Sequence, residues 1–143
     1  MSIFIERLKE YMDDAHLSGV SLAKAIGCSR VTISGLMNGA HAPSTKLLIK
    51  IVEYFNCSAD YLLGLTDYPK RENFDSVKPF GQRLKLCLSL AGKTEYRLQT
   101  DLHISRSLTY RWLNDMAIPS IESLKNLAKY FGCSVDYLLG RES

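Results

Sequence analysis

Apolar residues recur along this chain at steps of three and four, the spacing that places side chains on one face of an α-helix. Two such runs are Phe4, Leu8, Met12 and Ala15, and Phe80, Leu84, Leu88 and Ala91. No stretch alternates between apolar and polar residues, as a half-buried strand would. The hydrophobic pattern therefore predicts an all-α protein.

The chain also contains an internal duplication with an offset of 76 residues. Segment 54–64 recurs as segment 130–140 with nine of its eleven residues unchanged, and the same offset continues upstream without a gap. Between the two copies lies a polar stretch without apolar periodicity. We therefore predict two domains, at 1–64 and 80–143, joined by a linker at 65–79.

Serine residues mark where several helices are expected to begin, because a hydroxyl before an apolar run can accept a hydrogen bond from a free backbone amide. These serines are Ser29, Ser44 and Ser58, with their repeat mates Ser105, Ser120 and Ser134. The pattern predicts five short helices in the first unit, at 3–15, 21–26, 30–38, 45–55 and 59–63, and the second unit repeats them.

Composition narrows the class of protein without identifying a function. The 143 residues are 46% hydrophobic and 23% charged, which is typical of a globular protein. Apolar stretches are too short to span a bilayer, and the acidic N-terminal segment does not match a secretory leader, so a cytoplasmic protein with no membrane partner is expected. The four cysteines show no metal-ligand spacing and are expected to be reduced and buried.

The stretch 21–36 carries the most specific pattern in the chain. Ala23 is small enough for two helices to cross closely, and Gly27 stands where a turn favours a positive φ. The inward faces of the two predicted helices would be formed by Leu22, Ile26, Ile33 and Leu36.

Together these residues resemble the Cro and phage-repressor helix-turn-helix family, also described as lambda-repressor-like or xenobiotic-response-element proteins. The resemblance rests on Leu22-Ala23, Gly27, Ser29, Ile33, Asn38-Gly39, Pro43 and Asp60-Tyr61-Leu62-Leu63, and it covers both units. It implies two tandem five-helix DNA-binding domains in one chain, and hence a transcription regulator of the repressor type.

By this resemblance the third helix of each unit enters the major groove of double-stranded DNA. In the first unit the implied contact residues are Ser29, Arg30, Val31, Thr32, Ser34 and Asn38. In the second unit they are Ser105, Arg106, Ser107, Tyr110, Arg111 and Asn114. The first-turn arginines are expected to read guanine, and the two asparagines are expected to contact phosphate.

The charge of the chain is concentrated in the second unit. Residues 80–143 hold nine Lys and Arg against six Asp and Glu, whereas residues 1–64 hold six of each. Lys93, Arg97 and Arg111 are therefore expected to contact phosphate. Gly35, on the third helix of the first unit, is expected only to leave room.

The second unit departs from the family pattern at three positions. Gln99, His103 and Thr109 stand where the first unit has Ala23, Gly27 and Ile33, which leaves the geometry of the second turn open.

Both units also lack the ion pair that many relatives place between the first and third helices. Met12 with Met37, and Leu88 with Leu113, occupy those positions, so we expect an apolar contact instead.

Several other residues have simpler interpretations. Trp112 matches Leu36 and is expected in the core, while Asp60 and Asp136 are expected to complement helix dipoles. The three histidines share no ligand spacing, so no metal is expected. Because no nucleophile lies beside a base and no carboxylates are paired, we expect neither an enzyme nor a cofactor.

Two functions remain open. In the first, both units read DNA, so that one chain does the work of a two-fold dimer. In the second, one unit binds DNA and the other docks on a second copy of the chain or on another protein, as in an antitoxin. Val31 and Gly35 on the neutral first unit favour this alternative.

Overall fold

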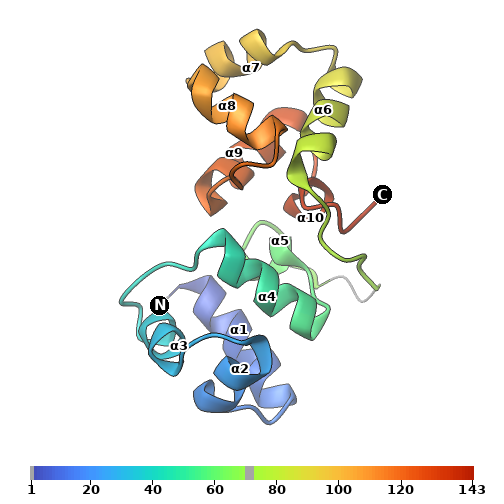
Figure 1. The fold of residues 1–143 in the computed structure, drawn as a ribbon. Coiled ribbons are helices and arrows are strands. Elements are labelled where there is room, and N and C mark those ends of the chain that lie inside the picture. Colours follow the sequence, from blue (N-terminus) through green and yellow to red (C-terminus); the bar gives the residue numbers. More distant parts are fainter. Residues whose placement is uncertain (1, 70–72) are drawn as a thin grey trace. The chain divides into compact units, whose positions relative to one another are not determined.

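The computed structural model of this protein describes residues 2–69 and 73–143, and these residues form ten α-helices and no strand (Figure 1). The all-α prediction is therefore confirmed. The chain divides into two compact units, one ending at Phe74 and the other beginning at Asp75. Among the described residues, every helix is too short to cross a membrane.

Each unit contains five helices in the same order. The first unit is built from α1 (Ile3–Asp14), α2 (Gly19–Ile26), α3 (Arg30–Met37), α4 (Thr45–Phe55) and α5 (Ala59–Leu62). The second is built from α6 (Phe80–Ala91), α7 (Glu95–Leu102), α8 (Arg106–Leu113), α9 (Ile121–Phe131) and α10 (Val135–Leu138). In the first unit the predicted helix ends differ from the observed ones by no more than two residues.

Serine hydroxyls begin the helices as expected. Ser29 accepts from the amide of Thr32 at 3.1 Å, Ser105 accepts from Leu108 at 3.1 Å, and the other four predicted serines do the same. The largest departure from the predicted bounds is at α2, which begins at Gly19 because Ser18 rather than a later residue caps it. The spacing of Ser18 and Ser21 carries this signal, which the sequence interpretation missed.

Equivalent residues fill the two cores. Fully buried side chains of the first unit include Leu8, Leu22, Leu36, Leu48, Ile51 and Leu62. Their repeat mates Leu84, Leu98, Trp112, Leu124, Leu127 and Leu138 are also fully buried. Trp112 is therefore a core residue, as expected, and its ring meets Phe80 edge-on at 6.2 Å.

The turn between α7 and α8 keeps its shape despite the departures from the family pattern. His103 adopts φ 55° and ψ 46°, close to the φ 72° and ψ 43° of Gly27. Thr109 is buried, and its hydroxyl donates to the backbone carbonyl of Ser105 at 3.0 Å, so its polar group is satisfied. The second turn therefore has the same geometry as the first.

Helix α6 begins differently from α1, because Pro79 has no side-chain oxygen that could cap it. Asp115, in the loop after α8, supplies this group and accepts from the amide of Gly81 at 2.8 Å. A Cβ atom at Gly81 would lie 2.4 Å from the carbonyl oxygen of Leu113, so only glycine lets the two helices approach this closely. The N-terminus of α6 is thus tied to the end of α8.

In each unit, an arginine on the first helix is hydrogen-bonded to backbone carbonyl groups at the C-terminal end of the unit. Arg7 donates to the carbonyl oxygens of Tyr61 and Thr66, and its guanidinium carbon lies 4.0 Å from the centre of the Tyr61 ring. Arg83 donates to the carbonyl oxygen of Glu142 at 3.0 Å and lies 4.2 Å from the centre of the Tyr137 ring. These positions match through the 76-residue offset, so the structural repeat continues beyond the duplicated segment.

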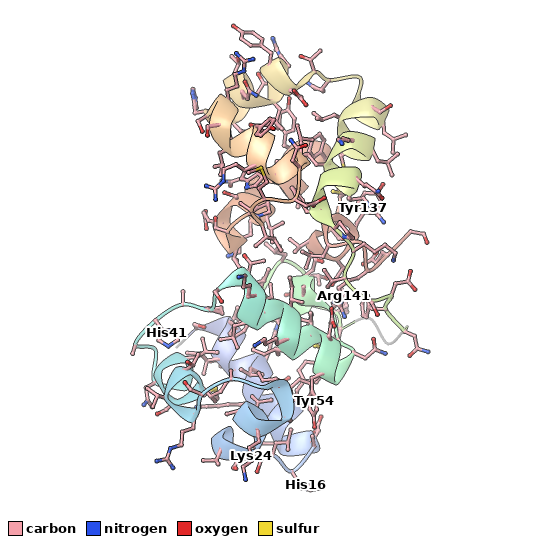
Figure 2. All side chains as sticks on the ribbon, in the orientation of Figure 1. His16, Lys24, His41, Tyr54, Tyr137 and Arg141 are labelled. Carbon is pink, nitrogen blue, oxygen red and sulfur yellow. The ribbon has the colours of Figure 1, made fainter. Side chains whose placement is uncertain are left out.

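The second unit also contains a buried ion pair. Arg141 Nη1 lies 2.5 Å from an Asp136 carboxylate oxygen, and both side chains are 1% exposed (Arg141 is labelled in Figure 2). The helix-dipole interpretation of Asp136 was therefore incomplete, because its counter-charge is a side chain beyond the last helix. The position equivalent to Arg141 in the first unit is Leu65, so this pair belongs to the second unit alone.

The described parts of segment 65–79 are bonded to the nearer unit. Asn56 donates to the side chain of Asn73 at 3.0 Å and accepts from the amide of Phe74 at 3.1 Å. On the other side, the amide of Asp75 donates to the carbonyl oxygen of Arg141 at 3.0 Å. Residues 70–72, in the middle of the expected linker, lie outside the described residues.

The cysteine prediction was only partly correct. All four cysteines are free, and Cys57 and Cys87 are buried as expected, but Cys28 and Cys133 are half-buried.

Because each unit has a core made from its own helices, we expect residues 1–74 and 75–143 to fold when produced as separate proteins. Far-UV circular dichroism during urea titration should show a helical signal and a cooperative transition for each. Units of this size are only marginally stable, so the two midpoints should be modest. If either half shows no transition, its core depends on the other half.

Replacing Asp136 by Asn should lower the free energy of unfolding by about 3–5 kcal/mol, because the buried guanidinium of Arg141 loses the ionised carboxylate 2.5 Å from it. Chemical denaturation of the full chain measures this effect. The matched control is Asp75→Asn, which removes an ion pair with Lys78 that is more than half exposed on both sides. That change should cost less than about 1 kcal/mol. Equal effects of the two substitutions would contradict the importance assigned to the buried pair.

Candidate nucleic-acid interface

Helix α3 has one inward and one outward face. Ile33 and Leu36 are buried, which fixes the orientation of the helix on the core. The outward face carries the exposed residues Arg30, Val31, Ser34 and Asn38. Of these, Val31 is 75% exposed, a large fraction for an apolar side chain. Residues predicted to contact DNA are therefore presented together to the solvent.

Helix α8 presents a more polar face. Thr109, Trp112 and Leu113 are buried against the second unit. The exposed residues are Arg106, Ser107, Tyr110, Arg111 and Asn114, which are the predicted set apart from the capping Ser105. Arg106, Tyr110 and Asn114 follow one another at steps of four, which places neighbouring side chains about 6 Å apart along one stripe. This stripe offers hydrogen-bond donors over the length of the helix.

The remaining predicted residues hold the ends of these helices. The Ser29 hydroxyl accepts from the amide of Thr32 and also lies 2.8 Å from the Thr32 hydroxyl. Thr32 is accordingly half-buried, while Ser105 caps α8 in the same way. At the other end, Asn114 donates to the carbonyl oxygen of Tyr110 at 2.9 Å, and Asn38 Nδ2 lies 3.5 Å from the Ser34 hydroxyl.

A groove of about 590 Å³ runs beside α3 in the first unit. One wall is the start of α2, with Ser18, Gly19 and Val20, and the other is the outward face of α3. Met12 and Met37 also line this groove, at the positions where an apolar contact was expected in place of an ion pair. The start of α2 was missing from the sequence-based set of candidate residues, because the helix was expected to begin two residues later.

The space left by the missing side chain of Gly35 is filled by His41. A Cβ atom there would lie 2.7 Å from Nε2 of His41, so the absent side chain lets the ring of His41 lie against α3 (His41 is labelled in Figure 2). In the second unit the large side chain comes from the helix and the small one from the loop. Arg111 stands in the position of Gly35, and Ala117 stands in that of His41. Each unit therefore places one large polar side chain at this site, from a different element.

The arginines on the outward faces of α3 and α8 have no ion-pair partner among the described residues. Among the described residues, no ion pair or side-chain hydrogen bond involves Arg30, Arg106 or Arg111. These three guanidinium groups are therefore available to a ligand.

Two other cations of the second unit are already engaged. Arg97 lies 3.2 Å from an Asp101 carboxylate oxygen, and Asp101 accepts from the Tyr130 hydroxyl at 2.6 Å. This hydrogen bond, and then the charges of Arg97 and Lys93, hold the pKa of Asp101 below its ordinary value. Lys93 Nζ lies 5.4 Å from the centre of the Tyr130 ring. The ionised Asp101 thus offsets part of the positive charge that the sequence assigned to phosphate contact.

Comparison with known proteins agrees with this arrangement. A helix-turn-helix family model matches the chain twice, at residues 8–62 and 84–138, which differ by the same 76-residue offset as the internal duplication. The ImmF control region 10 kDa protein of Bacillus phage phi105 is 36% identical over 55 residues, which make up 38% of this chain and 61% of that protein. The match thus covers less than two thirds of the phage protein. No solved structure matches the chain significantly.

The matched segments include α3 and α8, which carry the two outward faces, and the helices α2 and α7 that precede them. This chain belongs to the helix-turn-helix family of Cro and phage-repressor type and carries its domain twice.

Proposed function

We propose that this protein is a sequence-specific DNA-binding transcription regulator that acts as a repressor, with α3 and α8 as its recognition helices. The observation that carries the proposal is the outward face of α8. Arg106 and Arg111 stand there without an ion pair to any other described residue, on a helix whose other face is fixed by buried Trp112 and Leu113. Recognition of bases and phosphates requires hydrogen-bond donors that are held in a fixed orientation and are not already paired within the protein. The control-region name of the phage relative favours a regulatory role.

The chemistry of α8 suits the major groove. Arg106, on the first turn, can donate two parallel hydrogen bonds to O6 and N7 of guanine. One turn later, Tyr110 is 60% exposed and offers a hydroxyl together with an apolar ring. Arg111 lies on the edge of the same face and is suited to a phosphate oxygen. Base reading and phosphate binding would therefore come from different sides of one helix.

The chemistry of α3 is sparser. Arg30 can read guanine in the same way as Arg106, and Val31 can pack against a thymine methyl group. The start of α2 also lines the groove beside α3, and the N-terminus of a helix favours a phosphate group. With no excess positive charge, however, the first unit would contribute more to sequence preference than to affinity. The two units together would then act as two readers within one chain.

A second candidate role for the first unit is protein docking. Apolar Met12, Val20, Val31, Ile33 and Met37 form half of the lining of the groove beside α3, together with Ser18, Gly19, Arg30, Ser34 and Asn38, and the unit has equal numbers of positive and negative groups. Apolar lining and low charge are typical of a protein interface rather than of a DNA-binding surface. In this case α8 alone would read DNA, and the first unit would bind a second copy or another protein.

Arg30→Ala and Arg106→Ala should each relax the preference at one base pair, because each removes a bidentate contact to guanine. The expected loss of discrimination is about 1–3 kcal/mol. Duplexes selected from a random pool, and the same duplexes with single base changes, provide the measurement. Lys85→Ala, an exposed change on α6 outside both recognition helices, is the control. If Arg30→Ala has no effect while Arg106→Ala changes both affinity and preference, the docking role of the first unit is supported instead.

Arg111→Ala should weaken binding to all sequences alike, since a phosphate contact carries no base information. Loss of one such contact should flatten the slope of log K against log salt concentration by about 0.9. Arg97→Ala is a matched comparison, and its effect should be smaller because Asp101 already neutralises that guanidinium. Affinities measured over a salt series test both variants. An unchanged slope for Arg111→Ala would exclude this residue as a phosphate contact.

A further inference from the structure

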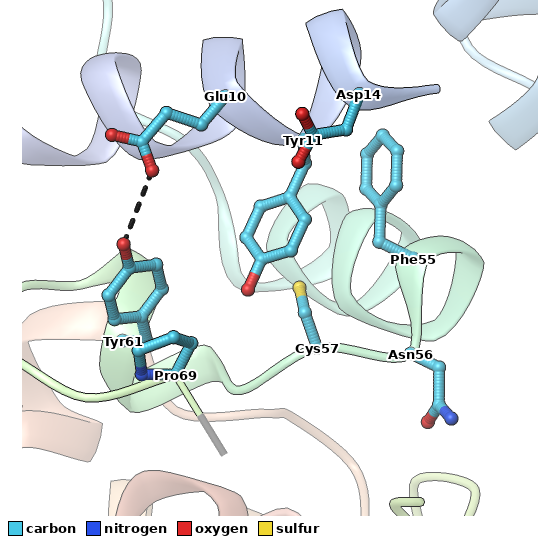
Figure 3. Close-up of a pocket in the computed structure, with 8 residues that line it drawn as sticks. All are labelled: Glu10, Tyr11, Asp14, Phe55, Asn56, Cys57, Tyr61 and Pro69. Atoms are coloured by element: carbon cyan, nitrogen blue, oxygen red, sulfur yellow. Dashed lines mark hydrogen bonds between the residues drawn. The ribbon is translucent and has the colours of Figure 1, made fainter. Parts of the chain in front are cut away.

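A second hollow in the first unit lies apart from the groove beside α3. It has a volume of about 310 Å³ and is formed by the ends of α1 and α4 and the start of α5. Three aromatic residues, Tyr11, Phe55 and Tyr61, line it together with the carboxylates of Glu10 and Asp14 (Figure 3). This volume is at the lower end of the range for small-molecule sites.

The three rings contact one another and together form an aromatic wall of the hollow. The centroids of Tyr11 and Phe55 are 5.6 Å apart with 31° between the planes, and those of Tyr11 and Tyr61 are 6.2 Å apart at 89°. An aromatic face carries partial negative charge and attracts a cation, and several faces set at angles form a cage for one. Arg7 covers part of the Tyr61 ring, so the exposed cage consists mainly of Tyr11 and Phe55.

The carboxylates give the hollow a negative charge. Glu10 accepts from the Tyr61 hydroxyl at 3.3 Å, and in the described parts of the chain neither Glu10 nor Asp14 takes part in an ion pair. The nearby cation Arg7 is instead engaged by backbone carbonyl oxygens and by Asp67 at 3.8 Å. Within residues 2–69 and 73–143, the carboxylates at the rim of the hollow therefore have no ion-pair partner.

The local environment also disfavours an additional negative charge. Burial, followed by the influence of Cys57, Tyr61 and Glu10, raises the pKa of Tyr11 to about 12. Tyr11 thus remains a neutral phenol and adds no negative charge of its own to the hollow.

The duplication supplies an independent comparison. In the second unit, Leu86, Cys87 and Leu90 stand where the first unit has Glu10, Tyr11 and Asp14, whereas Phe131 and Tyr137 retain the other two rings. The five-helix fold therefore forms without the two acids and without the tyrosine on its first helix. Their presence in the first unit is not a requirement of packing.

We infer that this pocket binds a small organic cation of the alkylammonium class. The aromatic faces of Tyr11 and Phe55 would contact the alkyl groups around the charged nitrogen, and Glu10 and Asp14 would supply the compensating negative charge. The site shares no residue with the groove beside α3 and would be occupied whether or not the protein is bound to DNA. This inference is therefore independent of the proposed function.

Choline and its neutral carbon analogue 3,3-dimethylbutan-1-ol are suitable probes, because they differ in charge but hardly in shape. We expect choline to bind the full-length protein saturably, without DNA, with a Kd of about 1 mM. Chemical shifts of the Tyr11, Phe55 and Tyr61 ring protons in NMR titrations report on binding at this pocket. The neutral analogue should bind at least about tenfold more weakly.

The combined change Glu10→Gln and Asp14→Asn should weaken choline binding by at least about tenfold, because it removes the negative charge while keeping the side-chain size. The matched control is Asp13→Asn, which neutralises an exposed acid on the same helix that does not line the pocket. Its Kd should change by less than about twofold. The backbone spectrum of each variant checks that it is folded. The inference is overturned if choline causes no saturable shift, if the neutral analogue binds equally well, or if Asp13→Asn weakens binding as much as the double change.

Discussion

The small size of each unit governs the rest of the structure. About sixty residues can enclose only a narrow core, so every helix must contribute its apolar side to that core. For α3 the contributed residues are Ile33 and Leu36, and for α8 they are Thr109, Trp112 and Leu113. Because these inner residues fix the rotation of each helix, the outward residues are fixed as well. The candidate interface is thus a consequence of core packing and requires no separate scaffold.

The duplication shows how much of a unit can change under this constraint. Most core positions keep their apolar character, with buried Thr109 in place of Ile33 as an exception, and residues at turns and surfaces diverged where a local solution existed. His103 adopts the left-handed conformation that glycine has in the first unit, and Asp115 caps helix α6, which is preceded by Pro79. Such replacements cost little, since each satisfies the same backbone requirement by a different group.

The divergence has given the two units different surfaces. The second unit carries exposed arginines on α8 that pair with no other described residue, and a buried ion pair between Asp136 and Arg141. The first unit carries an apolar groove beside α3 and a negatively charged aromatic pocket. One core architecture therefore supports a face suited to polyanions and, in the other unit, sites suited to apolar or cationic partners. A regulator built in this way would combine DNA recognition with a second input in one chain.

The sequence by itself determined the features that depend on near neighbours. Helical spacing gave the secondary structure, serines such as Ser29 and Ser105 gave the helix starts, and the repeat offset gave the equivalence of Leu36 and Trp112. These features can be predicted from the sequence because the hydrogen bonds within a helix, and the spacing of its buried residues, involve residues three or four positions apart.

Only the tertiary structure decided which distant residues meet. The contact of His41 with Gly35 and the pairing of Asp136 with Arg141 depend on how loops fold back onto helices. Likewise, the pocket at Tyr11 and Phe55 requires α1 and α4 to lie side by side. No local period encodes these contacts, because they are set by the packing angles of whole helices and by the volume of every side chain between them.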